Sequence, residues 1–207
     1  SFEHMHAWSY ANALTQGVRG ASLVAVADSD PLRLEEAKQK CPTVEGFYGD
    51  YRAMLDHSNL DGVVICSANC DHAEIAVECA RRGKHIMCEK PLALNIPDCQ
   101  RMIRAAREAG VKLMTAFPVR FSPAITEAKR LIDSGELGPV LGACTSNHGS
   151  MPGSWFVQKE KSGGGAVIDH TVHVVDVLRY MFEDEVESVY AEYATRLHDL
   201  DVEDVGQ

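Results

Sequence analysis

The sequence predicts an α/β protein in which a doubly wound parallel sheet is followed by the start of a second, mixed domain. Two observations predict the first part: short apolar runs recur along residues 21–117, and a helical segment lies between each run and the next. Strands and helices that alternate at intervals of about 25 to 35 residues are typical of a parallel sheet with helices on both faces. The regular alternation of apolar runs and helical segments ends after Phe117, which predicts a second, mixed domain.

The elements of the first domain are expected in a regular order. The first apolar run, ASLVAVADSD over residues 21–30, is typical of a strand buried on both faces, and helical composition follows over residues 31–40. Glycine is a common stop signal after a helix. The remaining expected strands are residues 61–69, 85–93 and 111–117. The helices that follow the first two of these end at Gly83 and Gly110.

The second domain is expected to mix helices and strands. A helix is expected over residues 123–134, and strand-like segments cover residues 140–149 and 186–197. We place the first domain at residues 1–117 and the second at residues 118–207. Because neither end completes a sheet, we expect a piece of a longer protein, without the first strand of the first domain and with an incomplete second domain.

Composition and charge exclude several classes of partner. Twenty Lys and Arg residues against thirty Asp and Glu residues give a net charge of −10, which repels nucleic acid and anionic membrane surfaces. No apolar run approaches the ~18 residues that a membrane span needs. The seven cysteines are scattered without a C-x-x-C pair, as is typical of buried thiols in a reducing compartment. We therefore expect a cytoplasmic protein with no nucleic-acid or membrane partner.

Polar residues stand at the carboxyl ends of the expected strands, where ligands bind in parallel α/β sheets. Asp28 occupies the position of an acid that hydrogen-bonds the ribose hydroxyls of NAD, and a 2′-phosphate there would be repelled. The alternative is an aspartate that caps the helix beginning at Pro31. The other polar positions at this edge lie at Ser67 to Asn69, Glu89 and Lys90.

The glycine loop that usually accompanies such an acid is not found. Where G-x-G-x-x-G would lead into the first helix, the sequence is SFEHMHA, with Glu3 in the register of the last glycine. A glutamate beside a pyrophosphate is unfavourable unless its side chain points away. The N-terminal residues therefore count against the binding of a dinucleotide cofactor, which Asp28 favours.

The run MCEKPLA places a lysine at the same edge of the sheet. Lys90 follows the third expected strand, and Pro91 fixes the turn behind it. An ammonium group in this position can donate a hydrogen bond to a carbonyl or hydroxyl oxygen and stabilise developing negative charge. The alternative is a surface pair of Glu89 and Lys90, which would contribute less than ~1 kcal/mol.

The stretch GGGAVIDHTVHVVD, residues 163–176, carries three glycines, two histidines and two aspartates. On a helix, residues spaced by four, three and four return to one face, and apolar residues cover most of the remaining circumference here. We therefore expect a buried helix with one polar seam, in which an Asp-His pair at i and i+4 orients the imidazole. A core histidine with satisfied hydrogen bonds is the alternative. The seam consists of Asp169, His173, Asp176 and Tyr180.

Two further hypotheses stay open for this stretch. Asp169, His170 and His173, with His148 upstream, offer acceptable zinc ligands, although His170 points away from His173 on a helix. The glycines at 163–165 could cradle a phosphate at a helix N-terminus. They follow a loop and not a strand, however, which favours close backbone packing or a flexible entry into the helix.

Taken together, these residues resemble the glucose-fructose oxidoreductase and inositol dehydrogenase family (Gfo/Idh/MocA). The resemblance runs over nearly the whole chain and is carried by the Glu-Lys-Pro and the G-G-G-x-x-x-D-x-x-x-H patterns in this order. It implies a dinucleotide-binding Rossmann domain at residues 1–117, for NAD with NADP as the alternative. It also implies a C-terminal α+β domain at residues 118–207, with a mostly antiparallel open sheet, for substrate and oligomer contacts. It also implies a catalytic group of Lys90, Asp169 and His173. The positions at the cofactor edge are Asp28, Ser67, Ala68, Asn69, His72, Glu89 and Lys90.

The sequence departs from the family pattern in three places. The glycine loop is absent or altered at residues 1–6, which bears on pyrophosphate binding. Ala68 stands where a proline is usual. His170 and Thr171 fill a spacer in which an apolar residue and glycine are common, and these two departures bear mainly on substrate choice.

The expected activity is reversible, NAD-dependent oxidation of a secondary alcohol on a sugar, polyol or related cyclic substrate. His173 would take the hydroxyl proton, Asp169 would hold its imidazole, and Lys90 would hydrogen-bond the reacting oxygen. A ligand or cofactor sensor without catalysis and a metal-dependent hydrolase or lyase are the alternatives. We expect a homo-oligomer, a dimer or tetramer. The expected substrate contacts are Arg120, His148, Trp155 and Asp176.

Overall fold

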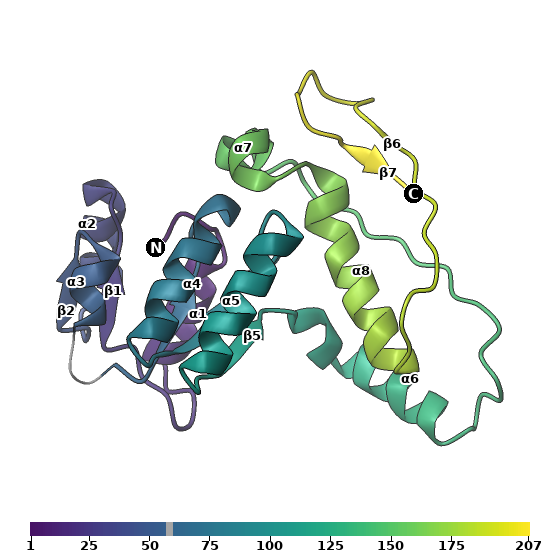
Figure 1. Cartoon of the computed structure of the whole chain (residues 1–207), viewed down its shortest axis with the longest axis horizontal. Coiled ribbons are helices and arrows are strands. Elements are labelled where there is room, and N and C mark those ends of the chain that lie inside the picture. The colour runs from purple at the N-terminus through teal and green to yellow at the C-terminus, as the bar shows by residue number, and fades with distance from the viewer. Residues whose placement is uncertain (57–59) are drawn as a thin grey trace. The chain divides into compact units, whose positions relative to one another are not determined.

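The computed structural model describes residues 1–56 and 60–207, and it divides into two compact units, Ser1–Thr115 and Ala116–Gln207. The division falls between Thr115 and Ala116, whereas the sequence-based domain boundary lay after Phe117. Figure 1 shows unit 1 as short strands with covering helices, in purple to teal, and unit 2 as a group of helices that includes the long helix α8 (Ala166–Phe182), in green.

Unit 1 alternates strands and helices. Its strands are β1 (Ala25–Ala27), β2 (Gly46–Tyr48), β3 (Gly62–Ile65), β4 (His85–Cys88) and β5 (Leu113–Thr115). Its helices are α1 (Ala7–Thr15), α2 (Pro31–Lys40), α3 (Tyr51–Leu55), α4 (His72–Arg81) and α5 (Ile96–Glu108), with a 3-10 turn, η1 (Asn69–Asp71), before α4.

The strands of unit 1 pair in parallel. In one ladder β1 pairs with β2, and Ala25 lies opposite Gly46. In the other, β4 lies between β3 and β5, so that Cys88 faces both Ile65 and Thr115. Parallel strands connected through helices are the arrangement of a doubly wound sheet. This confirms the Rossmann-type class predicted for the first part of the chain.

β2 and α3 were not expected from the sequence. β2 has only three residues, G-F-Y, which are too few for an alternation of apolar and polar side chains to show. Its first residue, Gly46, packs closely on β1, since a methyl group added there would lie 3.2 Å from the Cβ of Ala25. α3 follows at once and is capped by Asp50, which accepts a hydrogen bond from the backbone N–H of Arg52 at 3.0 Å.

The core of unit 1 forms where α4 and α5 pack against the strands. Ile65, Ile86 and Met102 are among its buried members, and a second cluster joins α1 and α2 to β1 around Ala37. Within the described residues, no ladder hydrogen bond joins β1 to β3. Both strands instead line a cavity of about 600 Å³, together with α1 and residues 1–3.

Unit 2 contains the helices α6 (Pro123–Asp133), α7 (Lys159–Ser162) and α8, with the 3-10 turns η2 (Pro118–Phe121) and η3 (Ser154–Val157). α6 packs against α8, as Figure 1 shows, and α8 also contacts β7 (Val205–Gly206). β7 pairs antiparallel with β6 (Tyr193–Ala194), and Ala194 lies opposite Val205. The antiparallel sheet expected for this part of the chain is therefore present as one short ladder.

Two strand predictions in unit 2 need correction. Residues 140–149 form neither helix nor strand, and Leu141 in this segment is 95% exposed. Of the strand expected over residues 186–197, only Tyr193 and Ala194 pair with another strand. An apolar run becomes a stable strand only beside neighbours, and unit 2 supplies no others in the part of the chain that the structure describes.

α8 is also less buried than its sequence predicts. Its buried residues are Asp176 and Val177, while Val175 and Phe182 are more than a third exposed. The expectation of a buried helix is therefore wrong for this structure, because α6 and a two-residue ladder cover only part of its apolar surface. None of the described helices is long and apolar enough to cross a membrane.

Candidate active site

Asp28 directly follows β1, and its carboxylate is fully buried. It accepts hydrogen bonds from the backbone N–H groups of Phe2 and Asp30 at 2.6 and 2.9 Å, and it pairs with the guanidinium group of Arg33. Burial would raise the pKa of the Asp28 carboxyl, but these donors, first among them Arg33, hold that pKa below its ordinary value. The site therefore holds an ionised acid at the end of β1.

The helix-cap alternative for Asp28 is wrong. The residue that caps α2 is Asp30, whose side chain accepts a hydrogen bond from the backbone N–H of Leu32 at 2.8 Å. Asp28 lies two residues earlier, directly after the strand.

The end of β3 is lined by the buried residues Ser67, Ala68 and Asn69. The backbone N–H of Ala68 donates a hydrogen bond to Oε2 of Glu3 at 3.2 Å. The carboxylate of Glu3 is therefore held on this edge and does not point away from it. Its negative charge opposes an anionic phosphate group in the same place.

His72, the first residue of α4, is completely buried. Its ring nitrogens lie 2.9 Å from the carbonyl oxygen of Pro91 and 3.3 Å from that of Ser67. Burial lowers the pKa of its imidazole. The ring thus ties the end of β3 to the turn after β4, which supports a structural role, and its predicted contact with a cofactor stays a prediction.

The Glu-Lys-Pro turn after β4 is anchored from α1. The carboxylate of Glu89 is 1% exposed and accepts hydrogen bonds from the hydroxyl of Tyr10 at 2.7 Å and from the backbone N–H of Lys90 at 3.1 Å. Nδ1 of His6 lies 3.1 Å from the same carboxylate. Glu89 and Lys90 are both buried, so the alternative of a surface ion pair is wrong.

The surroundings of Glu89 keep it ionised. Burial alone would raise the pKa of its carboxyl group. The side chains of His6, His4 and Tyr10 outweigh this effect and lower that pKa to about 2. His4, His6 and Tyr10 were not among the sequence-predicted site residues, because they lie about eighty positions before Glu89 and nothing in their spacing links them to it.

The predicted zinc ligands do not come together. In the described residues, the histidine and acidic side chains near enough to share an ion are those of His4, His6 and Glu89, and not His148, Asp169 and His173. The three that do gather already make hydrogen bonds: Nδ1 of His4 accepts the backbone N–H of His6 at 3.1 Å. That bond leaves the proton of a neutral His4 ring on Nε2, where a metal would have to displace it.

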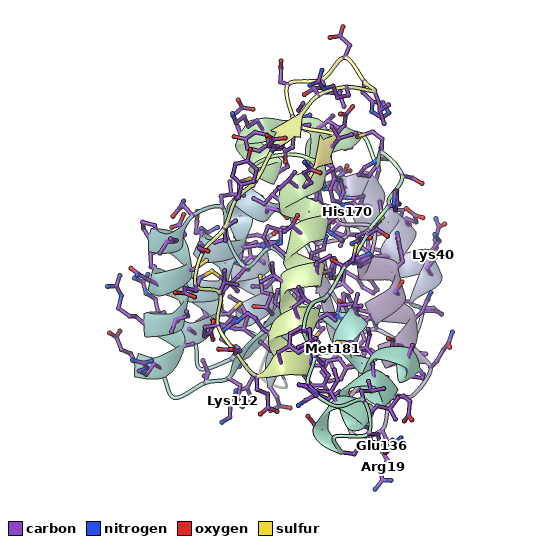
Figure 2. All side chains as sticks on the ribbon, turned by 90° about the vertical axis from the view of Figure 1, so that its right-hand side faces the viewer. Arg19, Lys40, Lys112, Glu136, His170 and Met181 are labelled. Carbon is purple, nitrogen blue, oxygen red and sulfur yellow. The ribbon has the colours of Figure 1, made fainter. Side chains whose placement is uncertain are left out.

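Asp169 and His173 both lie on α8, one turn apart. The carboxylate of Asp169 lies 3.2 Å from Nδ1 of His170, the neighbouring residue, and the ring of His173 meets Phe117 edge to face at 6.2 Å. The ring of His170, labelled in Figure 2, also lies against Gly149, because a methyl group added at Gly149 would come 2.1 Å from Nε2 of His170. His170 thus has defined neighbours that its sequence position did not reveal.

The predicted substrate contacts have varied surroundings. Arg120 and Asp176 bind each other through two hydrogen bonds, one of them 2.9 Å long, and Asp176 is 6% exposed. Trp155 is buried and stacks on Phe156, whereas His148 lies exposed in a loop. The ion pair and the stacked ring point to structural roles for three of these residues, and their contact with a substrate stays a prediction.

The glycines at the start of α8 serve close packing. A methyl group added at Gly165 would lie 1.9 Å from the carbonyl oxygen of Glu203, and one at Gly164 would lie 3.2 Å from its carboxylate. The space in front of the helix is therefore filled by a neighbouring segment of the chain. This favours close packing, and not the phosphate cradle, as the reason for the glycines.

The residues of unit 1 fit NAD in part. An ionised, buried aspartate at the end of β1 suits the two hydroxyl groups of a ribose, which donate hydrogen bonds. The position of Glu3 does not suit a pyrophosphate. Arg33, held beside Asp28, carries a charge that could balance a 2′-phosphate.

Comparison with known proteins assigns both units. Residues 5–117 match the oxidoreductase family with an NAD-binding Rossmann fold, and residues 125–207 match the GFO/IDH/MocA C-terminal domain. The myo-inositol 2-dehydrogenase of Thermotoga maritima is 36% identical over 173 residues, which are 83% of this chain and 51% of that protein. The levoglucosan dehydrogenase of Pseudarthrobacter phenanthrenivorans is 35% identical over 162 residues, 75% of this chain and 41% of the relative.

Solved structures agree with these relatives. The WlbA dehydrogenase of Bordetella pertussis, in complex with NADH and UDP-GlcNAcA, superposes with a TM-score of 0.83 at 27% identity. The match covers 99% of this chain and 63% of that one. The chain spans about half the length of the curated relatives that it matches. Both halves of the family's domain pair are recognised in it, and the protein belongs to the Gfo/Idh/MocA oxidoreductase family.

Proposed function

We propose that this protein is an NAD-dependent dehydrogenase that reversibly oxidises a secondary alcohol of a sugar, polyol or related cyclic compound. The observation that carries the proposal is the anchored turn at Glu89, which fixes Lys90 at the carboxyl end of β4 in a domain of NAD-binding type. Relatives named as inositol and levoglucosan dehydrogenases support the substrate class.

The proposed division of roles follows from the chemistry of each side chain. Asp28 accepts hydrogen bonds from the ribose of the cofactor. His173 removes the hydroxyl proton of the substrate, and Asp169 holds the imidazole for that task. Lys90 donates a hydrogen bond to the reacting oxygen and lowers the energy of its alkoxide character. NAD, when bound, supplies the acceptor for the hydride.

The choice between NAD and NADP depends on Asp28 and Arg33. The buried carboxylate repels a 2′-phosphate, which supports NAD as the cofactor. The adjoining guanidinium group is the feature that would favour NADP. Comparing the dissociation constants of NAD and NADP for the full-length protein tests the assignment, and tighter binding of NADP would overturn it.

A second candidate, a cofactor or ligand sensor without catalysis, is favoured by one observation. Glu3 occupies the register of the last glycine and places its carboxylate on the N–H of Ala68, where it opposes a pyrophosphate. A screen of inositols, levoglucosan and related sugars with full-length protein and NAD, followed at 340 nm, separates the two. Formation of NADH supports the dehydrogenase, whereas NAD binding without turnover of any substrate supports the sensor.

We further propose that the protein works in a reducing compartment, such as the cytoplasm, as a homo-oligomer. All seven cysteines are free, and Cys41, Cys66, Cys79 and Cys88 are buried, which suits reducing conditions. Sedimentation of the full-length protein would test the assembly, and a monomer at micromolar concentration would contradict it.

A further inference from the structure

α8 begins at a residue that cannot cap it. The first backbone N–H groups of a helix have no partner within the helix and need acceptors from elsewhere. The N-cap position is occupied by Gly165, which has no side chain to offer an acceptor. The donors of the first turn must therefore be satisfied by another part of the chain.

Glu203 supplies those acceptors from 38 residues away. Its Oε1 atom accepts the backbone N–H of Gly165 at 2.8 Å and that of Val167 at 3.2 Å, and it lies 3.5 Å from the N–H of Ile168. Its own carbonyl oxygen accepts the N–H of Ala166 at 2.8 Å. One residue thus serves four consecutive donors at the start of α8.

This arrangement depends on the glycines before the helix. A methyl group on Gly165 would overlap the backbone of Glu203, with its carbonyl oxygen at 1.9 Å and its nitrogen at 3.0 Å. A methyl group on Gly164 would press on the carboxylate oxygens at 3.2 and 3.3 Å. A residue without a side chain is therefore required at Gly165, and at Gly164 a side chain would fit only if the carboxylate of Glu203 shifted.

The segment that carries Glu203 is itself held in place. The carboxylate of Asp204 accepts hydrogen bonds from the backbone N–H groups of Arg196, Leu197 and His198 at 2.7 to 2.8 Å. The β6–β7 ladder follows immediately, and Gly206 lies so close to Val167 that an added methyl group would come 2.3 Å from Cγ2 of that valine. The hydrogen bonds to Asp204 and the β6–β7 ladder thus hold Glu203 in place beside the start of α8.

We propose that Glu203 is a positioning residue for the reaction assigned above, a role that rests on that proposed function. Asp169 follows Ile168, the last residue whose N–H faces Glu203, and His173 lies one turn further along. A shift of the first turn of α8 therefore moves both predicted catalytic side chains. The negative charge of Glu203 also suits the positive end of the helix dipole.

The experiment uses the full-length protein with Glu203→Ala, Glu203→Gln and, as a matched control, Glu187→Ala at an exposed glutamate of the same unit. Glutamine keeps an oxygen that can accept the N–H groups, whereas alanine offers none. A misplacement of 1 Å in an active site can cost about 100-fold in rate. We expect kcat to fall at least about tenfold in Glu203→Ala, with NAD affinity unchanged, and to recover to within about threefold in Glu203→Gln.

Two further measurements distinguish positioning from a general loss of stability. The titration of His173, followed by NMR, should shift in Glu203→Ala and not in Glu187→Ala. Hydrogen exchange at the amides of Val167 and Ile168 should accelerate in the alanine variant alone. Wild-type kcat together with an unshifted His173 titration in Glu203→Ala would overturn the proposal, as would equal losses in the glutamine and alanine variants.

A different result would show that the proposed function is wrong. A wild-type protein without turnover of any alcohol would refute the dehydrogenase assignment. The His173 titration and the amide exchange would still decide whether Glu203 fixes the start of α8.

Discussion

The hydroxyl group of Tyr10 on α1 donates a hydrogen bond of 2.7 Å to the carboxylate of Glu89, 79 residues later in the chain. This bond joins the first helix of unit 1 to the turn that carries Lys90. The carboxylate is buried, so each donor that it loses leaves part of its charge without compensation. The placement of Lys90 thus depends on Tyr10, a residue of α1 that is far from it in the sequence.

Replacing Tyr10 with phenylalanine should therefore destabilise unit 1. A hydrogen bond to a charged, buried group contributes about 1.5 to 3 kcal/mol, and we expect a loss of this size in the free energy of unfolding measured with urea. Tyr51→Phe is the matched control, since its hydroxyl lies 3.5 Å from the exposed carboxylate of Glu74 and should cost about 0.5 kcal/mol or less. Equal effects of the two substitutions would contradict the role of the Tyr10 bond.

The pKa of Glu89 makes stability depend on pH in a defined direction. Its pKa is about 2 in the folded protein and 4.5 ordinarily, so the folded state favours the charged form. The contribution is complete above pH 4.5 and is lost as the pH falls from 4.5 toward 2, with a size of up to about 3 kcal/mol. The free energy of unfolding at pH 7 and pH 3 measures it.

Glu89→Gln isolates this contribution. At pH 7 the variant should be less stable than the wild type. The difference should shrink at pH 3 because this carboxyl group, with its ordinary pKa of 4.5, takes up a proton in the unfolded wild-type chain before it does so in the folded protein. Glu74→Gln, at an exposed glutamate, is the control and should change the free energy of unfolding by about 1 kcal/mol or less. A difference for Glu89→Gln that stays constant from pH 7 to pH 3 would refute the assigned pKa.

Replacing Glu3 with glycine should strengthen cofactor binding. The change removes a carboxylate that the N–H of Ala68 holds at the ligand edge, and it restores the glycine of the usual loop. We expect the dissociation constant of NAD to fall by about three- to tenfold, equivalent to about 1 kcal/mol. Calorimetric titration of the full-length protein measures it, with Glu108→Ala, exposed at the carboxyl end of α5, as the control. Weaker binding in Glu3→Gly would show that Glu3 assists the cofactor.

Replacing Gly165 with alanine should disrupt the start of α8. The added methyl group would overlap the carbonyl oxygen of Glu203, and overpacking of this kind costs about 1 to 3 kcal/mol or more. Gly142→Ala is the control, because nothing lies within 4 Å of the position that its methyl group would take. Thermal unfolding measures both, and a Gly165→Ala protein as stable as Gly142→Ala would show that the contact is not required.

β1, β3 and β4 could be predicted because each lies in an apolar run that a helix follows. Within the run at residues 61–69, residues 62–65 form β3, and within the run at residues 85–93, residues 85–88 form β4. β2 escaped detection because three residues carry no period. The opposite error occurred at residues 140–149, where apolar side chains suggested a strand but no neighbouring strand pairs with the segment in the described structure.

The site could be predicted only where its residues are close in sequence or follow a strand. Lys90 and Asp28 were found in this way, and the helical spacing of Asp169 and His173 placed them on α8. Contacts between residues that are far apart in the sequence could not be predicted. Tyr10 with Glu89 and Glu203 with Gly165 are joined by folding alone, and neither pair leaves a local pattern.

The most direct test of the account is the turnover and cofactor binding of full-length His173→Ala, followed at 340 nm with NAD and the best substrate of the screen. We expect kcat/KM to fall by about 100- to 10,000-fold, with loss of the titration near neutral pH, while the dissociation constant of NAD stays within about threefold of the wild type. Glu187→Ala, at an exposed residue of the same unit, serves as the control for a substitution in unit 2. Turnover near the wild-type rate in His173→Ala would contradict the assignment of His173 as the base and, with it, the proposed mechanism.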